Sequence, residues 1–392
     1  MSPSDELRVG MVGYAFMGAA HSVAWRTVNR VFDLPAAARM AVICGRDAGQ
    51  VEAAAARLGW AESMTDWRAL IARDDIDVID ICTPGDSHAE IALAALAAGK
   101  HVLCEKPLAN TVEEARTMVA AAAAARSRGV RSMVGFNYRR VPAVAYMREL
   151  VANGRLGTIR HVRAVYLQDW IVDPEFPLVW RLQKEKAGSG ALGDIGAHII
   201  DMTQYVTGQT LVGVSGLTET FVKERPLPSA SSGLSASGSS EKGQVTVDDA
   251  TVFFGRLESG ALATYEATRF ATGRKNGLRV EVNGSLGSVA FDLERLNELE
   301  HYDADRAAGE QGFTRILVTE PAHPYMSAWW PPGHIIGYEH SFTHEMRDFI
   351  SAIAEGADPS PSFEDGLQVQ LVLDAVAQSA AAKSSWVPVG GV

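Results

Sequence analysis

Cysteine is scarce in this sequence, with only Cys44, Cys82 and Cys104 among 392 residues. Each lies at or near the end of a segment with the composition of a strand, and their spacing is not that of a zinc site. A small, odd number of cysteines indicates reduced and buried thiols rather than a disulfide framework, and it therefore predicts a cytoplasmic protein.

Long apolar runs are absent as well. The longest, 118–125, is mostly alanine and predicts a single helix, whereas a membrane-spanning helix needs about 20 apolar residues. The first eight residues are polar and lack the apolar core of a signal peptide. We therefore expect no membrane partner.

Positive charge is in deficit, because 36 Lys and Arg residues face 47 Asp and Glu residues, for a net charge of −11. This balance argues against nucleic acid or an anionic membrane as the main partner. An apolar fraction of 47% and a charged fraction of 21% are ordinary for a globular protein. The length is more than one hydrophobic core usually accommodates, so two domains are expected.

What the sequence does contain is a nucleotide-binding pattern near the N-terminus. A short apolar strand over 8–13 runs into a G-x-A-x-x-G turn that opens a helix. In the dinucleotide fingerprint the second small residue is usually glycine, which lets the backbone approach a pyrophosphate. The candidate coenzyme-binding residues of this turn are Gly13, Ala15, Phe16, Met17 and Gly18.

The second strand, 40–44, ends at Gly45, Arg46 and Asp47. NAD-binding enzymes usually place an acidic residue here for the ribose hydroxyls, whereas an arginine suits the 2′-phosphate of NADP. Arg46 therefore favours NADP modestly, with a solvated loop arginine as the alternative.

Strands alternate with helices over residues 7–137, which predicts βαβ units and a parallel sheet. A buried strand, 78–82, runs into a turn that contains Thr83, Pro84 and His88. Strand ends on the carboxyl side of such a sheet bind ligands, so these three are further coenzyme candidates. For His88, a place on a helix surface is the alternative.

The next strand, 101–104, ends abruptly in Glu105, Lys106 and Pro107. A lysine at this edge, beside a proline of fixed φ, presents a cation to the ligand-binding side of the sheet. A Glu-Lys surface pair would be the ordinary interpretation of these residues in isolation.

The pattern changes after residue 138. A strand-like segment at 161–167 is followed by a helix that begins near residue 194. Further strand-like segments then follow one another without intervening helices at 211–217, 250–257, 261–270, 278–282 and 288–293. This order predicts a mainly antiparallel sheet. The serine- and glycine-rich segment 229–243 predicts a mobile surface loop, and two helices, 338–355 and 365–383, close the chain. We place the domains at 1–138 and 139–392.

The second domain contains a glycine-rich turn, 187–193, followed by Asp194 and His198. Residues four apart share a helical face. An aspartate beside a histidine fixes its orientation and favours its charged form, which makes a competent proton acceptor. Such pairs are more often found on a helix surface, but the neighbouring glycines and the apolar 199–200 favour a buried helix.

Three motifs occur in the order seen in one family. They are the G-x-A-x-x-G turn, Glu105-Lys106-Pro107, and Gly193-Asp194-Ile195-Gly196-Ala197-His198. The chain resembles the Gfo/Idh/MocA oxidoreductases over nearly its whole length, and most of all the branches that oxidise levoglucosan and inositol. The resemblance implies an N-terminal Rossmann domain and a C-terminal domain built on a large, open, mainly antiparallel sheet. Ala15 and Arg46 depart from the family pattern and leave the choice between NAD and NADP open.

The resemblance also implies an activity and roles. The enzyme would oxidise a secondary hydroxyl of a sugar, a levoglucosan-like anhydrosugar or a cyclitol by hydride transfer to NAD(P). Lys106 would bind the reacting hydroxyl, His198 would accept its proton, and Asp194 would orient His198. Glu105 and Lys106 would also contact the coenzyme.

Further substrate candidates follow the last strand of the first domain or lie in the aromatic segment beyond it. They are Asn137, Tyr138, Arg139, Trp170 and Arg181, each of which could instead be a packing residue. His340 and His344 lack the H-E-x-x-H zinc spacing, and we read them as residues of a helix face or cleft rim, so no metal is expected.

The open sheet of the second domain needs a cover, which predicts a homodimer or homotetramer. Three other functions remain open at this point. They are a glycoside hydrolase that oxidises its substrate transiently with bound NAD, a biosynthetic keto-sugar reductase, and a non-catalytic nucleotide sensor, against which the Lys106, Asp194 and His198 set argues.

Overall fold

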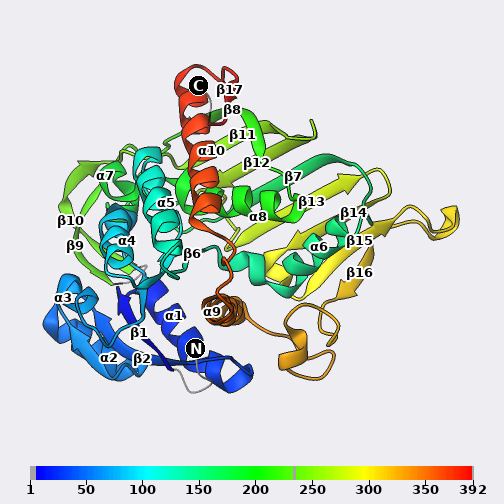
Figure 1. Cartoon of the computed structure of the whole chain (residues 1–392). Helices are drawn as coiled ribbons and strands as arrows, with labels where there is room; N and C mark the ends of the chain where they lie inside the picture. Colours follow the sequence, from blue (N-terminus) through cyan, green and yellow to red (C-terminus); the bar gives the residue numbers. More distant parts are fainter. Residues whose placement is uncertain (1–5, 233–234, 391–392) are drawn as a thin grey trace. The chain divides into compact units, whose positions relative to one another are not determined.

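The computed structural model describes residues 6–232 and 235–390. The chain divides into two compact units, which are described separately (Figure 1). The first comprises the chain up to Asn137 together with Tyr338–Gln370, and the second comprises most of the chain from Tyr138 to Gly337 and from Leu371 onward. Among the described residues, no helix has the length and apolar composition needed to cross a bilayer.

The first unit is built on a six-stranded sheet in the order β3-β2-β1-β4-β5-β6. All neighbouring pairs for which a register is given are parallel. The strands are β1 (Glu6–Val12), β2 (Ala37–Cys44), β3 (Glu62–Met64), β4 (Val78–Ile81), β5 (His101–Glu105) and β6 (Ser132–Gly135). The order reverses between β1 and β4, so the carboxyl ends of these strands form the switch point at which dinucleotides bind. The predicted parallel Rossmann sheet is confirmed.

Helices connect these strands as the sequence predicts. They are α1 (Phe16–Val31), α2 (Ala48–Leu58), α3 (Trp67–Ile71), α4 (His88–Ala97) and α5 (Val112–Arg126). Local signals set their starts. At α5, for example, Thr111 Oγ1 accepts the N–H of Glu114 at 3.2 Å, and the Glu114 carboxylate accepts the N–H of Thr111 at 3.0 Å. This reciprocal capping satisfies two N–H groups that a helix start otherwise leaves unpaired.

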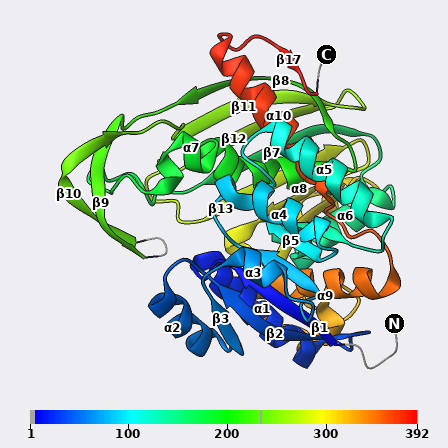
Figure 2. The same ribbon diagram turned by 60° about the vertical axis from the view of Figure 1, so that its left-hand side comes forward.

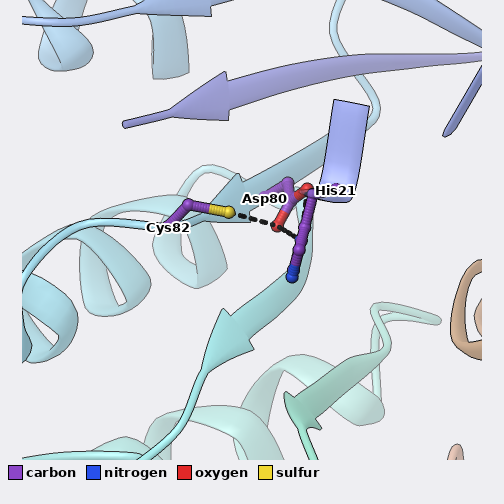
Figure 3. Close-up of side chains that lie close together, drawn as sticks. All are labelled: His21, Asp80 and Cys82. Atoms are coloured by element: carbon purple, nitrogen blue, oxygen red, sulfur yellow. Dashed lines mark hydrogen bonds and ion pairs between the residues drawn. The ribbon is translucent and has the colours of Figure 1, made fainter. Parts of the chain in front are cut away.

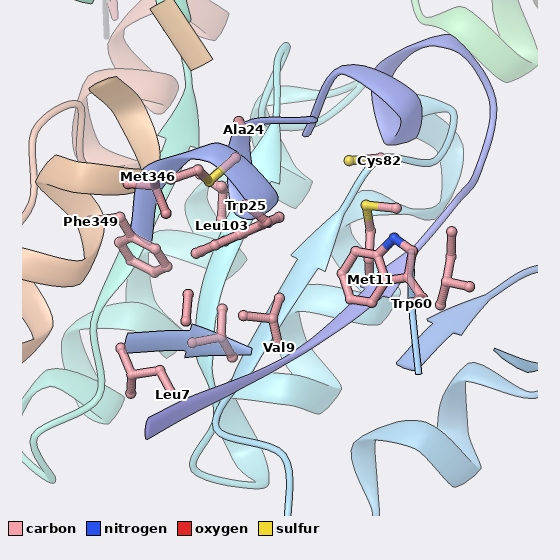
Figure 4. Close-up of a cluster of buried hydrophobic side chains, with 14 of the residues drawn as sticks. Leu7, Val9, Met11, Ala24, Trp25, Trp60, Cys82, Leu103, Met346 and Phe349 are labelled. Carbon is pink, nitrogen blue, oxygen red and sulfur yellow. The ribbon is translucent and has the colours of Figure 1, made fainter. Parts of the chain in front are cut away.

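The core of the first unit lies between β1, α1 and α9 (Tyr338–Glu355) (Figure 4). Val9 and Met11 of β1, Trp25 of α1 and Phe349 of α9 are at most 1% exposed. The sequence-based boundary at residue 138 assigns α9 to the second domain, whereas the structure packs it on α1. The period of the apolar residues in α9 identifies a buried face, but it does not identify the helix that covers that face.

The second unit contains a nine-stranded sheet in the order β16-β15-β14-β13-β7-β12-β11-β8-β17. Its strands are β7 (Ile159–Leu167), β8 (Leu211–Glu219), β11 (Ala250–Leu257), β12 (Leu262–Thr268), β13 (Gly277–Gly284), β14 (Gly287–Asp292), β15 (Glu298–Asp303), β16 (Thr314–Leu317) and β17 (Val387–Pro388). Neighbouring strands are antiparallel except β7 and β12, which are parallel. The predicted large, mainly antiparallel sheet is confirmed.

One face of this sheet is covered by α6 (Pro142–Ala152) and α8 (Ala197–Thr207), and α10 (Phe363–Ala381) follows near the C-terminus. Residues of β11 alternate between buried and exposed, as do those of β12 up to Ala267, with Phe253 and Tyr265 buried and stacked on the covered face. The intervening residues, such as Val252, Phe254 and Leu262, are about half exposed (55%, 52% and 48%) on the other face. Among the described residues, this other face carries half-exposed apolar side chains and is only partly covered by its own unit, where the ring centroids of Trp386 and Phe254 are 6.4 Å apart.

The prediction of a mobile loop over 229–243 was wrong for the part of that segment that the structure describes. Glu224–Ser232 (β9) and Ser235–Gln244 (β10) pair as a separate two-stranded ribbon (Figure 2). Backbone hydrogen bonds alone pair such strands, so a polar composition rich in serine does not exclude them. Residues 233–234 lie outside the described part.

Candidate active site

The turn between β1 and α1 has the geometry of a pyrophosphate-binding loop. Gly13 has a φ of +108°, and a Cβ there would lie 2.6 Å from the carbonyl oxygen of Cys82. A Cβ on Gly18 would lie 2.2 Å from the carbonyl oxygen of Gly13. Both positions therefore require glycine.

Ala15 is the N-cap of α1 and has no side-chain acceptor for the first N–H groups of the helix, and the first turn carries no acidic residue. Those N–H groups suit an anion. The residues of this turn thus fit a dinucleotide. Of the other two candidates here, Phe16 is 42% exposed and Met17 packs against the core.

At the end of β2, the structure separates Arg46 from its acidic neighbour. Asp47 caps α2, its carboxylate accepting the N–H of Gln50 at 2.8 Å. Tyr14 covers Gly45 so closely that a Cβ at position 45 would lie 2.0 Å from the ring. Arg46 is exposed, which leaves its guanidinium available to a phosphate.

The loop after β4 and the loop after β5 are joined by His88. This residue is 1% exposed, so the helix-surface alternative was wrong. Its Nδ1 lies 3.0 Å from the carbonyl oxygen of Pro107, and its Nε2 lies 2.9 Å from that of Thr83. Ser87 also donates its hydroxyl to Thr83 Oγ1 at 2.8 Å. His88 thereby holds together the two loops that carry Thr83 and Lys106.

In the second unit, the glycine-rich turn ends in a single π-helical turn, Leu192–Gly196, before α8 begins. Asp194 lies in this wide turn, and His198 lies in the first turn of α8. The sequence predicts an ordinary helix start, whereas π turns are rare and occur often at functional sites.

Asp248, just before β11, holds this turn. Its carboxylate accepts the N–H of Gly190 at 2.7 Å and that of Leu192 at 2.8 Å, and its carbonyl oxygen accepts the N–H of Ala191 at 3.0 Å. A Cβ on Gly190 would lie only 1.7 Å from that carbonyl oxygen. Burial raises the pKa of Asp248, which these hydrogen bonds partly offset.

Arg269 follows β12 and is fully buried. Its Nη1 lies 3.5 Å from Asp194 Oδ2, and its Nη2 donates to the carbonyl oxygen of Asp248 at 3.1 Å. Nη1 also lies 3.5 Å from the carbonyl oxygen of Arg181. One cation therefore links the π turn, the segment just before β11 and the segment that contains Arg181.

His198 lies among aromatic rings. The ring centroid of Tyr138 is 4.7 Å from that of His198, and the centroid of Tyr166 is 5.9 Å away. The hydroxyls of the two tyrosines are 2.9 Å apart, and Tyr166 donates to Asn276 Oδ1 at 2.8 Å. Since Tyr166 has only one hydroxyl proton, Tyr138 is the donor between the two.

A polar chain continues from Asn276 to Trp170. Gln168 donates to Asn276 Oδ1 at 2.9 Å and accepts from Trp170 Nε1 at 3.1 Å. Trp170 also packs edge-on against Phe176, with centroids 5.3 Å apart. Its ring is thus fixed in place, whether or not it contacts a substrate.

The other substrate candidates have partners of their own. Arg139 is buried and places Nε 2.9 Å from Asp201 Oδ2, while Asn137 donates to Ser341 Oγ at 2.8 Å. Arg181 lies over the ring of Trp180 at 4.4 Å. Burial lowers the pKa of Arg181, while the charge of Asp194 opposes that shift. The substrate role of these residues stays a prediction.

Sequence reasoning missed Arg269, Asp248, Tyr166 and Asn276 as parts of this site. No motif connects them to Asp194 and His198, because Tyr166 lies on β7 and the other three lie in the segments next to β11, β12 and β13. Of the two readings of His344, a helix face agrees with the structure, since His344 is fully buried in α9 and its ring contacts that of Phe32.

Comparisons with known proteins agree with this geometry. Residues 7–136 match the family model "Oxidoreductase family, NAD-binding Rossmann fold", and residues 144–290 match "GFO/IDH/MocA C-terminal domain". The chain is 45% identical over 390 residues to levoglucosan dehydrogenase of Pseudarthrobacter phenanthrenivorans, covering 98% of each chain.

Two solved structures are similar over nearly their full length. One is an oxidoreductase domain protein from Kribbella flavida, with 62% identity, a TM-score of 0.94 and coverage of 98% of this chain and 99% of that one. The other is levoglucosan dehydrogenase in complex with NADH and levoglucosan, with 44% identity, a TM-score of 0.92 and coverage of 99% and 100%. The chain therefore belongs to the Gfo/Idh/MocA family of oxidoreductases.

Proposed function

We propose that this protein is an NAD(P)-dependent dehydrogenase that oxidises a secondary hydroxyl of a sugar, an anhydrosugar or a cyclitol to a ketone. The observation that carries the proposal is the π turn that presents Asp194 beside buried Arg269, one helical turn before His198. The same chain carries a glycine turn shaped for a dinucleotide. In this proposal the first domain, 1–138, binds the coenzyme and the second, 139–392, binds the substrate.

Three side chains divide the work. Lys106 donates a hydrogen bond to the reacting hydroxyl and stabilises its developing negative charge. His198 accepts the hydroxyl proton, and Asp194 orients His198 and stabilises its charged form. Nicotinamide, when bound, is the hydride acceptor. Proton and hydride must leave together, because an alcohol that keeps its proton cannot release hydride.

The similarity to levoglucosan dehydrogenase makes a levoglucosan-like anhydrosugar the first substrate to test. The polar chain of Gln168 and Asn276 beside His198 offers groups that hydrogen-bond to hydroxyls. The ring of Trp170 suits the apolar face of a sugar ring.

The test is the absorbance of reduced coenzyme at about 340 nm, a property of nicotinamide chemistry, with levoglucosan, glucose or myo-inositol as substrate. Formation of NAD(P)H in step with ketone supports the proposal. Release of a glycosidic leaving group without net absorbance change would support a hydrolase instead. Consumption of NAD(P)H with only keto-sugars would support a reductase, and coenzyme binding without any turnover would support a sensor.

We also propose a modest preference for NADP, which rests on the exposed Arg46 at the end of β2. The levoglucosan dehydrogenase structure contains NADH, and that relationship favours NAD. Side-by-side titrations with NAD⁺ and NADP⁺ decide between them. An Arg46→Ala variant that weakens NADP⁺ binding alone would identify Arg46 as the phosphate ligand.

A homodimer or homotetramer formed through the partly covered sheet face is the proposed assembly. Val252, Phe254 and Leu217 are more than half exposed there, which is costly for a free surface. Beside them lies a groove with charges of both signs, whose charged lining residues are Arg163, Arg279, Glu281, Asp292, Arg295, Glu298 and Glu300. A two-fold contact brings opposite charges of such a face together.

Light scattering of the purified protein tests this assembly. Phe254→Asp should shift the protein to monomers, and Phe313→Asp, at a second half-exposed phenylalanine, is the matched control. A monomeric wild-type protein would contradict the proposal.

The cytoplasmic location that we propose rests on three free, buried thiols.

A further inference from the structure

A buried histidine outside the proposed machinery lies between two carboxylates. His21 of α1 is fully buried, and its Nδ1 lies 3.0 Å from both carboxylate oxygens of Asp80 in β4. Its Nε2 lies 2.9 Å from Oε1 of Glu105, the last residue of β5. Figure 3 shows His21 pointing at Asp80, with Cys82 on the other side of that carboxylate.

The hydrogen-bond partners define the protonation of His21. An ionised carboxylate only accepts hydrogen bonds, so each ring nitrogen that faces one must carry a proton. Between two ionised carboxylates His21 is an imidazolium, which agrees with the direction of its pKa shift. Burial by itself lowers the pKa of His21, but the adjacent Asp80 carboxylate outweighs that effect, and the pKa is raised well above its ordinary value.

The group of His21, Asp80 and Cys82 is close enough to resemble a metal site. Its chemistry is that of a proton network instead. Trp25 donates its Nε1–H to Asp80 Oδ2 at 2.7 Å, and Cys82 lies with Sγ 3.6 Å from Oδ1. Burial raises the pKa of the Cys82 thiol, which keeps it protonated, whereas a metal needs a thiolate and a ring nitrogen without its proton.

The network ends at the lysine loop. The second oxygen of Glu105, Oε2, accepts the backbone N–H of Lys106 at 3.1 Å. A Cβ on Gly135 of β6 would lie 3.1 Å from Glu105 Oε1, so the carboxylate fills the space beside that strand. Both oxygens of Glu105 are thus engaged, one by His21 and the other by the residue that begins the loop.

We propose that His21 is a positioning residue for Lys106. The buried imidazolium fixes the Glu105 carboxylate, and this carboxylate fixes the backbone from which the Lys106 side chain extends. The inference rests on the proposed catalytic role of Lys106. Without His21, two buried carboxylates would lack their shared cation, and Glu105 would have to turn or take up a proton.

The test compares His21→Gln with His101→Gln. His101 lies at the opposite end of β5, where its Nδ1 accepts the N–H of Arg131 at 2.9 Å. We expect His21→Gln to lower kcat by about 10- to 100-fold, as a small misplacement of a catalytic group does, with substrate KM and coenzyme Kd changed less than about twofold. His101→Gln should leave all three unchanged. An equal loss in both variants, or an unchanged kcat in His21→Gln, would overturn the proposal.

A double variant separates positioning from simple loss of packing. Glu105→Gln and His21→Gln act on the same link, so His21→Gln/Glu105→Gln should be no slower than the slower single variant. Multiplied effects would indicate independent roles and contradict the proposal.

A third readout does not depend on activity. Nitrogen-15 spectra of histidine side chains, at about two pH units above the ordinary histidine pKa, should include a signal from an imidazole with both nitrogens protonated that is assigned to His21 by its loss in His21→Gln. That signal should be absent from His21→Gln and from the double variant Glu105→Gln/Asp80→Asn. Either variant that folds is sufficient for the test. A neutral His21 in the wild type would overturn the inference even if the enzyme is active. A charged His21 in a protein whose Lys106→Ala variant keeps full turnover would instead refute the proposed role of Lys106.

Discussion

The guanidinium of Arg269 is fully buried and lies 3.5 Å from the carboxylate of Asp194, whose side chain is 28% exposed. The buried Arg269 thus contacts the inner side of the Asp194 carboxylate, which remains partly exposed on its other side. Its other contacts, to the carbonyl oxygens of Asp248 and Arg181, link the turn to the segments that contain these two residues. This arrangement fixes the direction in which the Asp194 carboxylate points.

Replacing Arg269 by methionine should lower kcat by about tenfold or more and reduce the free energy of unfolding by about 3 kcal/mol, because a buried ionic network loses its cation. Initial rates and thermal unfolding measure the two effects. Arg306→Met, at an exposed arginine that donates to Thr314, is the control and should change neither. Full activity of Arg269→Met would contradict its role at Asp194.

Gly190 leaves no space for a side chain, since a Cβ would lie 1.7 Å from the Asp248 carbonyl oxygen. Gly190→Ala must therefore displace the turn that leads to Asp194, at a cost of about 1–3 kcal/mol or more. We expect kcat/KM to fall strongly, while thermal unfolding shows only that moderate loss of stability. Gly309→Ala is the matched control, because nothing lies within 4 Å of a Cβ there. Equal behaviour of the two variants would refute the packing argument.

The titration of His101 should make the free energy of unfolding depend on pH. Burial lowers the pKa of His101 to about 4, with Asp77 opposing the shift and Arg131 adding to it. A histidine with a lowered pKa binds its proton less well when folded, so stability decreases as the pH falls from about 6.5 towards about 4.

The size of this effect at pH 5 is about 2 kcal/mol relative to neutral pH. The variant His101→Gln lacks this titration, so its stability relative to the wild type should rise by that amount between about pH 7 and about pH 5. Chemical unfolding at the two pH values measures the change. A constant difference between the two proteins would show that His101 is protonated freely in the folded state.

The order of strands and helices in the first domain could be predicted from the sequence, because each element has local signals of its own. Gly13 and Gly18 mark the coenzyme turn, and Thr111 with Glu114 marks the start of α5. The last two strands at one end of the large sheet, β15 and β16, were not predicted, because their short polar segments resemble loops in composition.

The candidate site was only partly predictable. Glu105-Lys106 and Asp194 with His198 stand out because each motif is contiguous. Arg269 lies 75 residues beyond Asp194, and His21 lies 84 residues before Glu105. Such pairs meet only because strands distant in the sequence are neighbours in a sheet, and one sequence contains no periodic signal for that contact.

The central claim is that His198 accepts a proton while hydride leaves the same carbon. The most direct measurement is the initial rate of NAD(P)H formation from levoglucosan by the wild type and by His198→Asn, with coenzyme affinity measured on both proteins. We predict that His198→Asn lowers kcat by about 100-fold or more and leaves coenzyme Kd within about twofold, since the coenzyme turn is unchanged. A variant that keeps most of the wild-type turnover would contradict the account.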